Sequence, residues 1–212
     1  MTPEELARLH PRLYHVTSPR SWPLIERMGL LSTAALLALF EVEEERRIAL
    51  TTRRRAGNTR LSHPLHGEAL VTNNAPLDER KLAACLEDGL SPADWLRILN
   101  ARVFFWVDRP RVDLLLEAER RRGTEREVLV FDTLGLVGAH AARVEIAPFN
   151  SGSTLHVPAR RGLSTFAPLL PTDHAAWRHR RGLSRPDRIV ELVVRDGVPD
   201  AARHLVAREV AA

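Results

Sequence analysis

Cysteine, lysine and aromatic residues are scarce in this chain of 212 residues. Cys85 is the only cysteine, which excludes an intrachain disulfide and any metal site built from several thiolates. Lys81 is the only lysine among 31 basic residues. No signal peptide is visible, and the longest apolar run, 30–40, is interrupted by polar residues and too short to cross a bilayer. We therefore expect a cytoplasmic protein that does not enter the membrane.

Several common catalytic motifs are also missing. No Gly-x-Gly-x-x-Gly follows a strand, so a Rossmann-type dinucleotide site is not supported. His-Glu-x-x-His and Gly-x-Ser-x-Gly are absent as well, which removes the usual signals of metal and serine hydrolases. His63 and His66 lie three residues apart, but in a proline-containing segment without a third ligand. We expect no metal site.

The composition is that of an ordinary globular protein, with 44% hydrophobic and 27% charged residues and a net charge of +4. The preference for arginine over lysine has two explanations that composition does not separate. GC-rich coding produces it, and guanidinium groups also suit the binding of phosphates in a dinucleotide or a nucleic acid.

The hydrophobic pattern mixes short strands with helices and does not alternate them regularly, which favours an α+β fold. We expect one domain over 1–212, with long loops at 48–66 and 148–187. The run 103–107 is continuously apolar and is expected to be a central strand covered on both faces. The predicted helices are 1–12, 34–47, 78–86, 91–100 and 110–122. The other predicted strands are 13–17, 68–71, 127–131, 143–146, 189–194 and 205–210.

The first predicted strand carries polar groups at its end. His15 and Thr17 close the strand, a turn follows, and an amphipathic helix over 22–28 is expected to pack behind them. Gly29 then fits the left-handed position after a helix. The pattern predicts an imidazole and hydroxyl groups held at a strand end, although a lone histidine in an apolar strand is often only structural.

Glu191 interrupts the apolar strand predicted for 189–194. A carboxylate inside such a strand is costly unless it is paired or functional. Simple alternation, with Glu191 facing solvent, is the other interpretation, and the pattern alone leaves both open.

Three motifs together carry a family resemblance. They are His15-x-Thr17 with its turn, short helix and Gly29-Leu30; the aromatic strand 104–107 followed by Arg109; and Glu191-Leu192-Val193 followed by Val198-Pro199. This set resembles the ADP-ribosyltransferase fold, most closely the DNA-modifying DarT branch and more distantly the NAD-using RNA 2′-phosphotransferases. The resemblance implies a split mixed β-sheet flanked by helices.

The resemblance also implies NAD as co-substrate and assigns roles to residues. Glu191 would stabilise the positive charge that develops on the ribose, while His15 and Thr17 would hold the ribose hydroxyl and the carboxamide. Trp106 would line the cleft. The expected pyrophosphate ligands are Arg109 and one residue of the run 53–55, for which we take Arg54. Four residues are assigned to a loop that faces the acceptor substrate: Asn150, Ser151, Arg161 and Thr165.

The expected function is therefore that of an NAD-dependent ADP-ribosyltransferase acting on a nucleotide or on DNA or RNA. The resemblance further implies a toxin with an antitoxin protein as partner, or a phage-defence effector. The DarT pattern places a catalytic arginine before the aromatic strand, whereas the comparable region 70–76 has Arg80 downstream of it. Two alternatives stay open: a non-catalytic nucleotide- or nucleic-acid-binding module on the same fold, and an RNA 2′-phosphotransferase-like enzyme.

Overall fold

The computed structural model describes residues 1–155, 158–183 and 189–211. The strands are β1 (Arg12–Thr17), β2 (Leu30–Leu31), β3 (Thr59–His63), β4 (Gly67–Val71), β5 (Arg102–Trp106), β6 (Arg126–Asp132), β7 (Val144–Ala147), β8 (Ala167–Pro168), β9 (Glu191–Arg195), β10 (Gly197–Val198) and β11 (Leu205–Ala211). The α-helices are α1 (Pro3–Leu9), α2 (Trp22–Met28), α3 (Thr33–Leu39), α4 (Glu44–Thr52), α5 (Glu79–Cys85), α6 (Pro92–Asn100), α7 (Arg109–Arg121), α8 (Thr133–His140), α9 (His174–Arg180) and α10 (Ala201–His204). Short 3₁₀ turns lie at Ala141–Arg143 and Leu163–Thr165.

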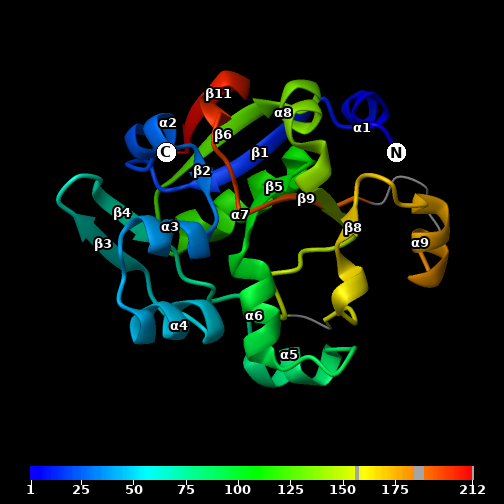
Figure 1. Cartoon of the computed structure of the whole chain (residues 1–212), viewed down its shortest axis with the longest axis horizontal. Helices are drawn as coiled ribbons and strands as arrows, with labels where there is room; N and C mark the ends of the chain where they lie inside the picture. Colours follow the sequence, from blue (N-terminus) through cyan, green and yellow to red (C-terminus); the bar gives the residue numbers. More distant parts are fainter. Residues whose placement is uncertain (156–157, 184–188, 212) are drawn as a thin grey trace.

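Seven strands form the main sheet, in the order β11-β6-β1-β5-β9-β7-β8 (Figure 1). The α+β class is confirmed, but the expectation of a mixed sheet is wrong, because every ladder between these strands is antiparallel. Each strand therefore runs in the direction opposite to its neighbours. The prediction that 1–212 forms one domain stays a prediction; the sheet does contain strands from both ends of the chain.

The sheet is split near its middle. β1 pairs with β6 over six positions, whereas it meets β5 at a single pair, Tyr14 with Trp106. β5 in turn pairs with β9 over five positions. The three strands β11, β6 and β1 therefore diverge from the four strands β5, β9, β7 and β8 beyond that pair.

Helices cover both faces of the sheet. On one face, α1, α2, α8, α9 and α10 contribute side chains to a core that includes Phe105 and Leu192. On the other, α7 packs on β1 and β6, while α5 and α6 pack on Phe104 and Val193. Burial on both faces confirms the continuously apolar β5 as a central strand. In the described part of the chain, no helix is long and apolar enough to cross a membrane.

Two expectations about the segment 34–66 are wrong. The predicted helix 34–47 is divided, with α3 ending at Leu39 and α4 beginning at Glu44. Phe40 is buried and Glu41 has a positive φ of 49°, so the chain turns there. The acidic residues that follow suit the start of a helix better than its end, because the helix dipole favours negative charge at the N-terminus. The predicted loop 48–66 contains the end of α4 and strand β3, which forms a hairpin with β4 beside α3 and α4 (Figure 1).

The predicted loop 148–187 also holds regular structure in its described residues, including β8 and α9. Its residues 156–157 and 184–187 lie outside the description. β8 pairs with β7 at the edge of the sheet. The lack of a clear hydrophobic period in this segment hid elements that depend on contacts with the sheet rather than on local propensity.

Gly29 lies where a segment near the start of the chain packs closely against residues 198–199. Its φ of 78° was expected, but its ψ of 179° is extended rather than left-handed helical, a combination that is almost confined to glycine. A Cβ on Gly29 would lie 2.4 Å from the Val198 carbonyl oxygen and 2.5 Å from the Pro199 Cα. This close approach allows β2 to pair with β10, directly after the strand that carries Glu191.

We expect Gly29→Ala to destabilise the fold by about 3 kcal/mol, because it combines a disfavoured backbone conformation with a clash against backbone atoms. Gly67→Ala is the matched control: Gly67 has φ 76° but open space around its Cβ position, so only the backbone penalty of about 1 kcal/mol should appear. Urea denaturation would measure both. Equal losses would contradict the role of the close approach.

Candidate functional site

A cavity of about 540 Å³ opens where β1 and β5 separate. Its walls come from the end of β1, the following turn and α2, the β3–β4 hairpin, α6 and β5. Its volume lies in the usual range for small-molecule sites. His15, Thr17, Trp106 and Glu191, four of the predicted site residues, line it.

The split explains how His15 and Glu191 reach one cavity. Tyr14 stands opposite Trp106, and Trp106 stands opposite Glu191, so these three side chains share one face of the sheet. His15, the next residue along β1, belongs to the other face. In a continuous sheet the imidazole and the carboxylate would be separated by the backbone, but the divergence of β1 from β5 opens a gap that both side chains line.

His15 is held by a backbone carbonyl across that gap. Its Nδ1 lies 2.9 Å from the Phe104 carbonyl oxygen, which only accepts, so Nδ1 carries the hydrogen. Desolvation lowers the pKa of His15, and the bond to Phe104 works in the opposite direction. A neutral ring therefore keeps a lone pair on Nε2, which has no hydrogen-bond partner among the described residues and can accept a hydroxyl or amide hydrogen from a ligand.

Glu191 is buried, with 5% of its surface exposed, and this rules out the interpretation that it faces solvent. The backbone N–H and the hydroxyl of Ser151 both donate to Oε2, at 3.1 and 2.6 Å. Burial raises the pKa of Glu191 to about 7, against the lowering effects of Ser151 and of the Arg161 and Arg111 charges. The carboxyl group thus changes its charge close to neutral pH.

Arg55 supplies a positive charge to the same cavity. Its Nε donates to the Thr72 carbonyl, and one terminal nitrogen donates to the Leu50 carbonyl and to Asn100 Oδ1. The other terminal nitrogen has no hydrogen-bond partner among the described residues. Burial lowers the pKa of Arg55, and no carboxylate of the described residues forms an ion pair with it. A partly buried guanidinium that faces a cavity without a counter-ion is suited to an anionic ligand.

Arg109 does not take part in the cavity, contrary to the sequence expectation. It lies at the start of α7, where it forms ion pairs with Asp113 and with Glu209 of β11. The hydrogen bonds that Arg109 donates to these carboxylates raise its pKa. Its guanidinium is therefore occupied on a part of the sheet away from the cavity lining.

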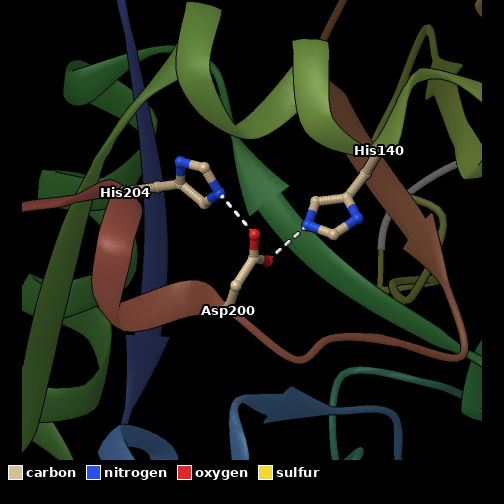
Figure 2. Close-up of side chains that lie close together, drawn as sticks. All are labelled: His140, Asp200 and His204. Carbon is tan, nitrogen blue, oxygen red and sulfur yellow. Dashed lines mark hydrogen bonds and ion pairs between the residues drawn. The ribbon is translucent and has the colours of Figure 1, made fainter.

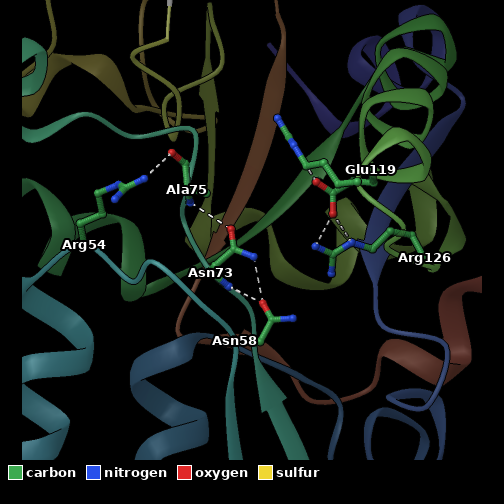
Figure 3. A network of polar contacts seen from close by, with 7 residues as sticks. Arg54, Asn58, Asn73, Ala75, Glu119 and Arg126 are labelled. Atoms are coloured by element: carbon green, nitrogen blue, oxygen red, sulfur yellow. Dashed lines mark hydrogen bonds and ion pairs between the residues drawn. The ribbon is translucent and has the colours of Figure 1, made fainter.

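Arg54 is likewise placed elsewhere. Its guanidinium donates to the Ala75 carbonyl at 3.1 Å, at one end of a chain of polar contacts that continues through Asn73 to Asn58 (Figure 3). The same view shows Glu119 paired with Arg126 in a separate network. The adjacent Arg55 lines the cavity instead.

The four residues assigned to an acceptor loop do not line the cavity. Ser151, Arg161 and Thr165 are buried, and Asn150 is exposed but bonds to the Gly152 backbone. Thr165 accepts from the Gly162 N–H and from Arg181. Among the described residues of this segment, Gly152 is the one that lines the cavity.

The structure adds residues that the sequence did not single out. Arg20 of the turn after β1 and Arg60 of β3 line the cavity rim and are exposed, with no ion pair or side-chain hydrogen bond to any described residue. Arg20 lies close in sequence to His15, which was a usable signal. Arg60 falls in the segment that was interpreted as a loop, so its direction could not be inferred.

A second polar cluster lies outside the cavity, between α8 and α10 (Figure 2). Asp200 accepts from His140 Nε2 at 2.6 Å and from His204 Nε2 at 3.1 Å. Arg143 lies 2.9 Å from His140 Nδ1 and can only donate, so Nε2 of a neutral His140 carries the hydrogen and is not free to bind a metal. Burial works against ionisation of Asp200, but the two imidazoles leave its pKa below the ordinary value. The contacts favour a structural network that joins the two helices.

Comparison with known proteins gives one match. A family model described as "Family of unknown function (DUF7002)" matches residues 11–205. The search of curated proteins gave no match. The search of solved structures also gave none.

We expect the unfolding free energy to lose on the order of 3 kcal/mol between pH 4.5 and 7 through Glu191 alone. The folded state binds a proton more tightly than the unfolded chain, whose carboxyl has a pKa near 4.5, so this contribution falls as pH rises through that window. Denaturation across pH of the wild type and Glu191→Gln measures it as their difference. Glu26→Gln, at an exposed position, is the control for replacing a glutamate at the surface. A flat difference for Glu191→Gln would contradict the raised pKa.

Proposed function

Since the chain belongs to the DUF7002 family, whose function is not known, we propose its function from the cavity: it is an NAD-dependent ADP-ribosyltransferase that modifies a nucleotide or nucleic acid. The observation that carries the proposal is the meeting of His15 and Glu191, from opposite ends of the chain, in one cavity. Two of the three motifs that resemble ADP-ribosyltransferases begin at these two residues.

The polar atoms that line the cavity fit NAD. His15 Nε2, the Thr17 hydroxyl and one terminal nitrogen of Arg55 have no partner among the described residues, and all three residues line the cavity. His15 and Thr17 would hold the ribose hydroxyl and the carboxamide. Arg55 would bind the pyrophosphate, replacing the expected Arg54 and Arg109. Trp106, beside Glu191, offers apolar surface to a planar ring.

NAD would be the donor of ADP-ribose. When its nicotinamide–ribose bond breaks, the electron pair leaves with nicotinamide and positive charge develops on the ribose. The ionised Glu191 carboxylate stabilises that charge. A cationic ligand beside Glu191 also favours its ionised form, which counteracts the effect of burial on its pKa. His15 holds the sugar through Nε2, so that the acceptor meets the anomeric carbon in a fixed orientation.

The DarT resemblance extends the proposal to biological context. It includes DNA or RNA as acceptor, action in the cytoplasm, and a role as the toxin of a toxin–antitoxin pair or as a phage-defence effector. The exposed arginines at the cavity rim support a polyanionic acceptor, because they can contact phosphates without first breaking an ion pair of the described protein.

One observation favours a second candidate, an enzyme that removes a 2′-phosphate from RNA with NAD. Arg20, Arg55 and Arg60 all line the cavity, and three cations exceed what one pyrophosphate needs. That chemistry depends on a histidine and arginines rather than on a glutamate. The effect of replacing Glu191 therefore separates the two candidates.

We expect Glu191→Gln to reduce nicotinamide release and label transfer from radiolabelled NAD to DNA, RNA or lysate at least 100-fold, because the charge that stabilises the sugar cation is lost. The wild-type rate at low NAD should rise with pH through about 7, as Glu191 ionises. Retained removal of an RNA 2′-phosphate by Glu191→Gln would favour the second candidate. NAD binding by the folded wild type without turnover would indicate the non-catalytic module.

Arg55→Gln is expected to weaken NAD binding 10- to 100-fold in calorimetry, since a charge-assisted contact to phosphate is lost. Arg54→Gln is the matched control, because Arg54 is its neighbour in sequence but bonds to the Ala75 carbonyl outside the cavity. Its affinity should stay within twofold of the wild type. The reverse ranking would contradict the assignment of the phosphate ligand.

A further inference from the structure

The carboxylate of Glu191 is held on one side only. Both hydrogen bonds from Ser151, one from its backbone N–H and one from its hydroxyl, go to Oε2. Oε1 receives no hydrogen bond from a described residue, although Glu191 lines the cavity. One oxygen is therefore fixed by the protein, and the other is left for whatever occupies the cavity.

Ser151 is in turn held by a buried cation. An Arg161 terminal nitrogen donates to the Ser151 carbonyl at 2.8 Å and to the Ser153 carbonyl at 3.2 Å, and the Trp95 indole N–H reaches the Ser151 carbonyl at 3.4 Å. Arg161 is 1% exposed and stacks over Phe149. The segment around Ser151 is thus held by side chains that do not line the cavity.

Ser151 thus connects Arg161 with Glu191 through hydrogen bonds. Arg161 donates to the Ser151 carbonyl, and the backbone N–H and the hydroxyl of the same residue donate to Glu191. Among the described residues, the charges of Arg161 and, from α7, of Arg111 act on Glu191. No carboxylate forms an ion pair with Arg161 among the described residues, although the charge of Glu191 acts on it.

We propose that Ser151 is a positioning residue for Glu191: it holds Oε2, directs Oε1 into the cavity and favours the ionised carboxylate that the sugar cation needs. Because Ser151 and Arg161 are buried and do not line the cavity, they would hold the Glu191 carboxylate rather than contact the acceptor. The inference rests on the proposed function for its kinetic consequence, but its structural part does not.

The first experiment needs no activity. Carbon-13 NMR of side-chain-labelled glutamate would follow the titration of Glu191, with its signal assigned by loss in Glu191→Gln. In Ser151→Ala the pKa of Glu191 should rise by about one pH unit, because a hydrogen bond to the charged form is lost. Ser151→Cys, with a weaker donor, should fall between. Ser153→Ala is the matched control from the same segment and should titrate as the wild type. An unmoved titration in Ser151→Ala would overturn the proposal.

The second experiment measures nicotinamide release against pH. Ser151→Ala should move the rising limb of the rate to higher pH and lower kcat about 10-fold above it, with KM for NAD changed less than kcat. If Ser151 has only a structural role, Ser151→Ala will lower the melting temperature and leave the pH of the rising limb of the rate unchanged. That result would also overturn the proposal. If Glu191 moves in the NMR titration but the wild type releases no nicotinamide, the proposed function fails while the positioning role stands.

Discussion

The hydrogen bond between the His15 imidazole and the Phe104 carbonyl is the contact on which the cavity depends. Where β1 and β5 separate, the Phe104 carbonyl loses the ladder partner that a continuous sheet would provide. A buried carbonyl left without a partner costs about 1–3 kcal/mol, so the imidazole allows the sheet to open at low cost. The same bond fixes the tautomer and leaves Nε2 for a ligand. The same hydrogen bond thus satisfies the carbonyl at the opening of the sheet and orients the imidazole for a ligand.

The cavity concentrates ionisable groups that the fold does not neutralise. Glu191 has its pKa raised to about 7, and Arg55 is desolvated with no carboxylate partner among the described residues. Other buried carboxylates are paired, as Glu119 is with Arg126 and Glu127 with Arg208. Each unpaired charge lowers stability, and the loss is recovered when a ligand of complementary charge binds.

Local sequence signals predicted much of the fold but not the directions of its side chains. The start of α6 followed from its capping box, Ser91 and Asp94, and β5 followed from its apolar run. Glu191 and His15 stood out because each is a polar residue in an apolar strand. The choice of Arg54 over Arg55, and of Arg109, failed because a run of arginines does not reveal which guanidinium meets a carboxylate or carbonyl brought in from elsewhere. The antiparallel sheet and the roles of Ser151 and Arg161 depend on pairing over many residues, which local patterns do not encode.

Glu191 and Asp200 show why a cluster of suitable residue types is not by itself a site. Asp200 has a histidine N–H on each of its oxygens, its pKa is below the ordinary value, and its neighbour His140 is fixed by Arg143 in a tautomer that cannot bind a metal. Glu191 has both of its donors on one oxygen, a raised pKa and a cavity beside the other oxygen. Both oxygens of the first carboxylate already accept a hydrogen bond, whereas Oε1 of the second accepts none from a described residue. The same test separates Arg55 from Arg109. Chemical availability in this fold is therefore set by the hydrogen-bond capacity that the surrounding elements leave unused.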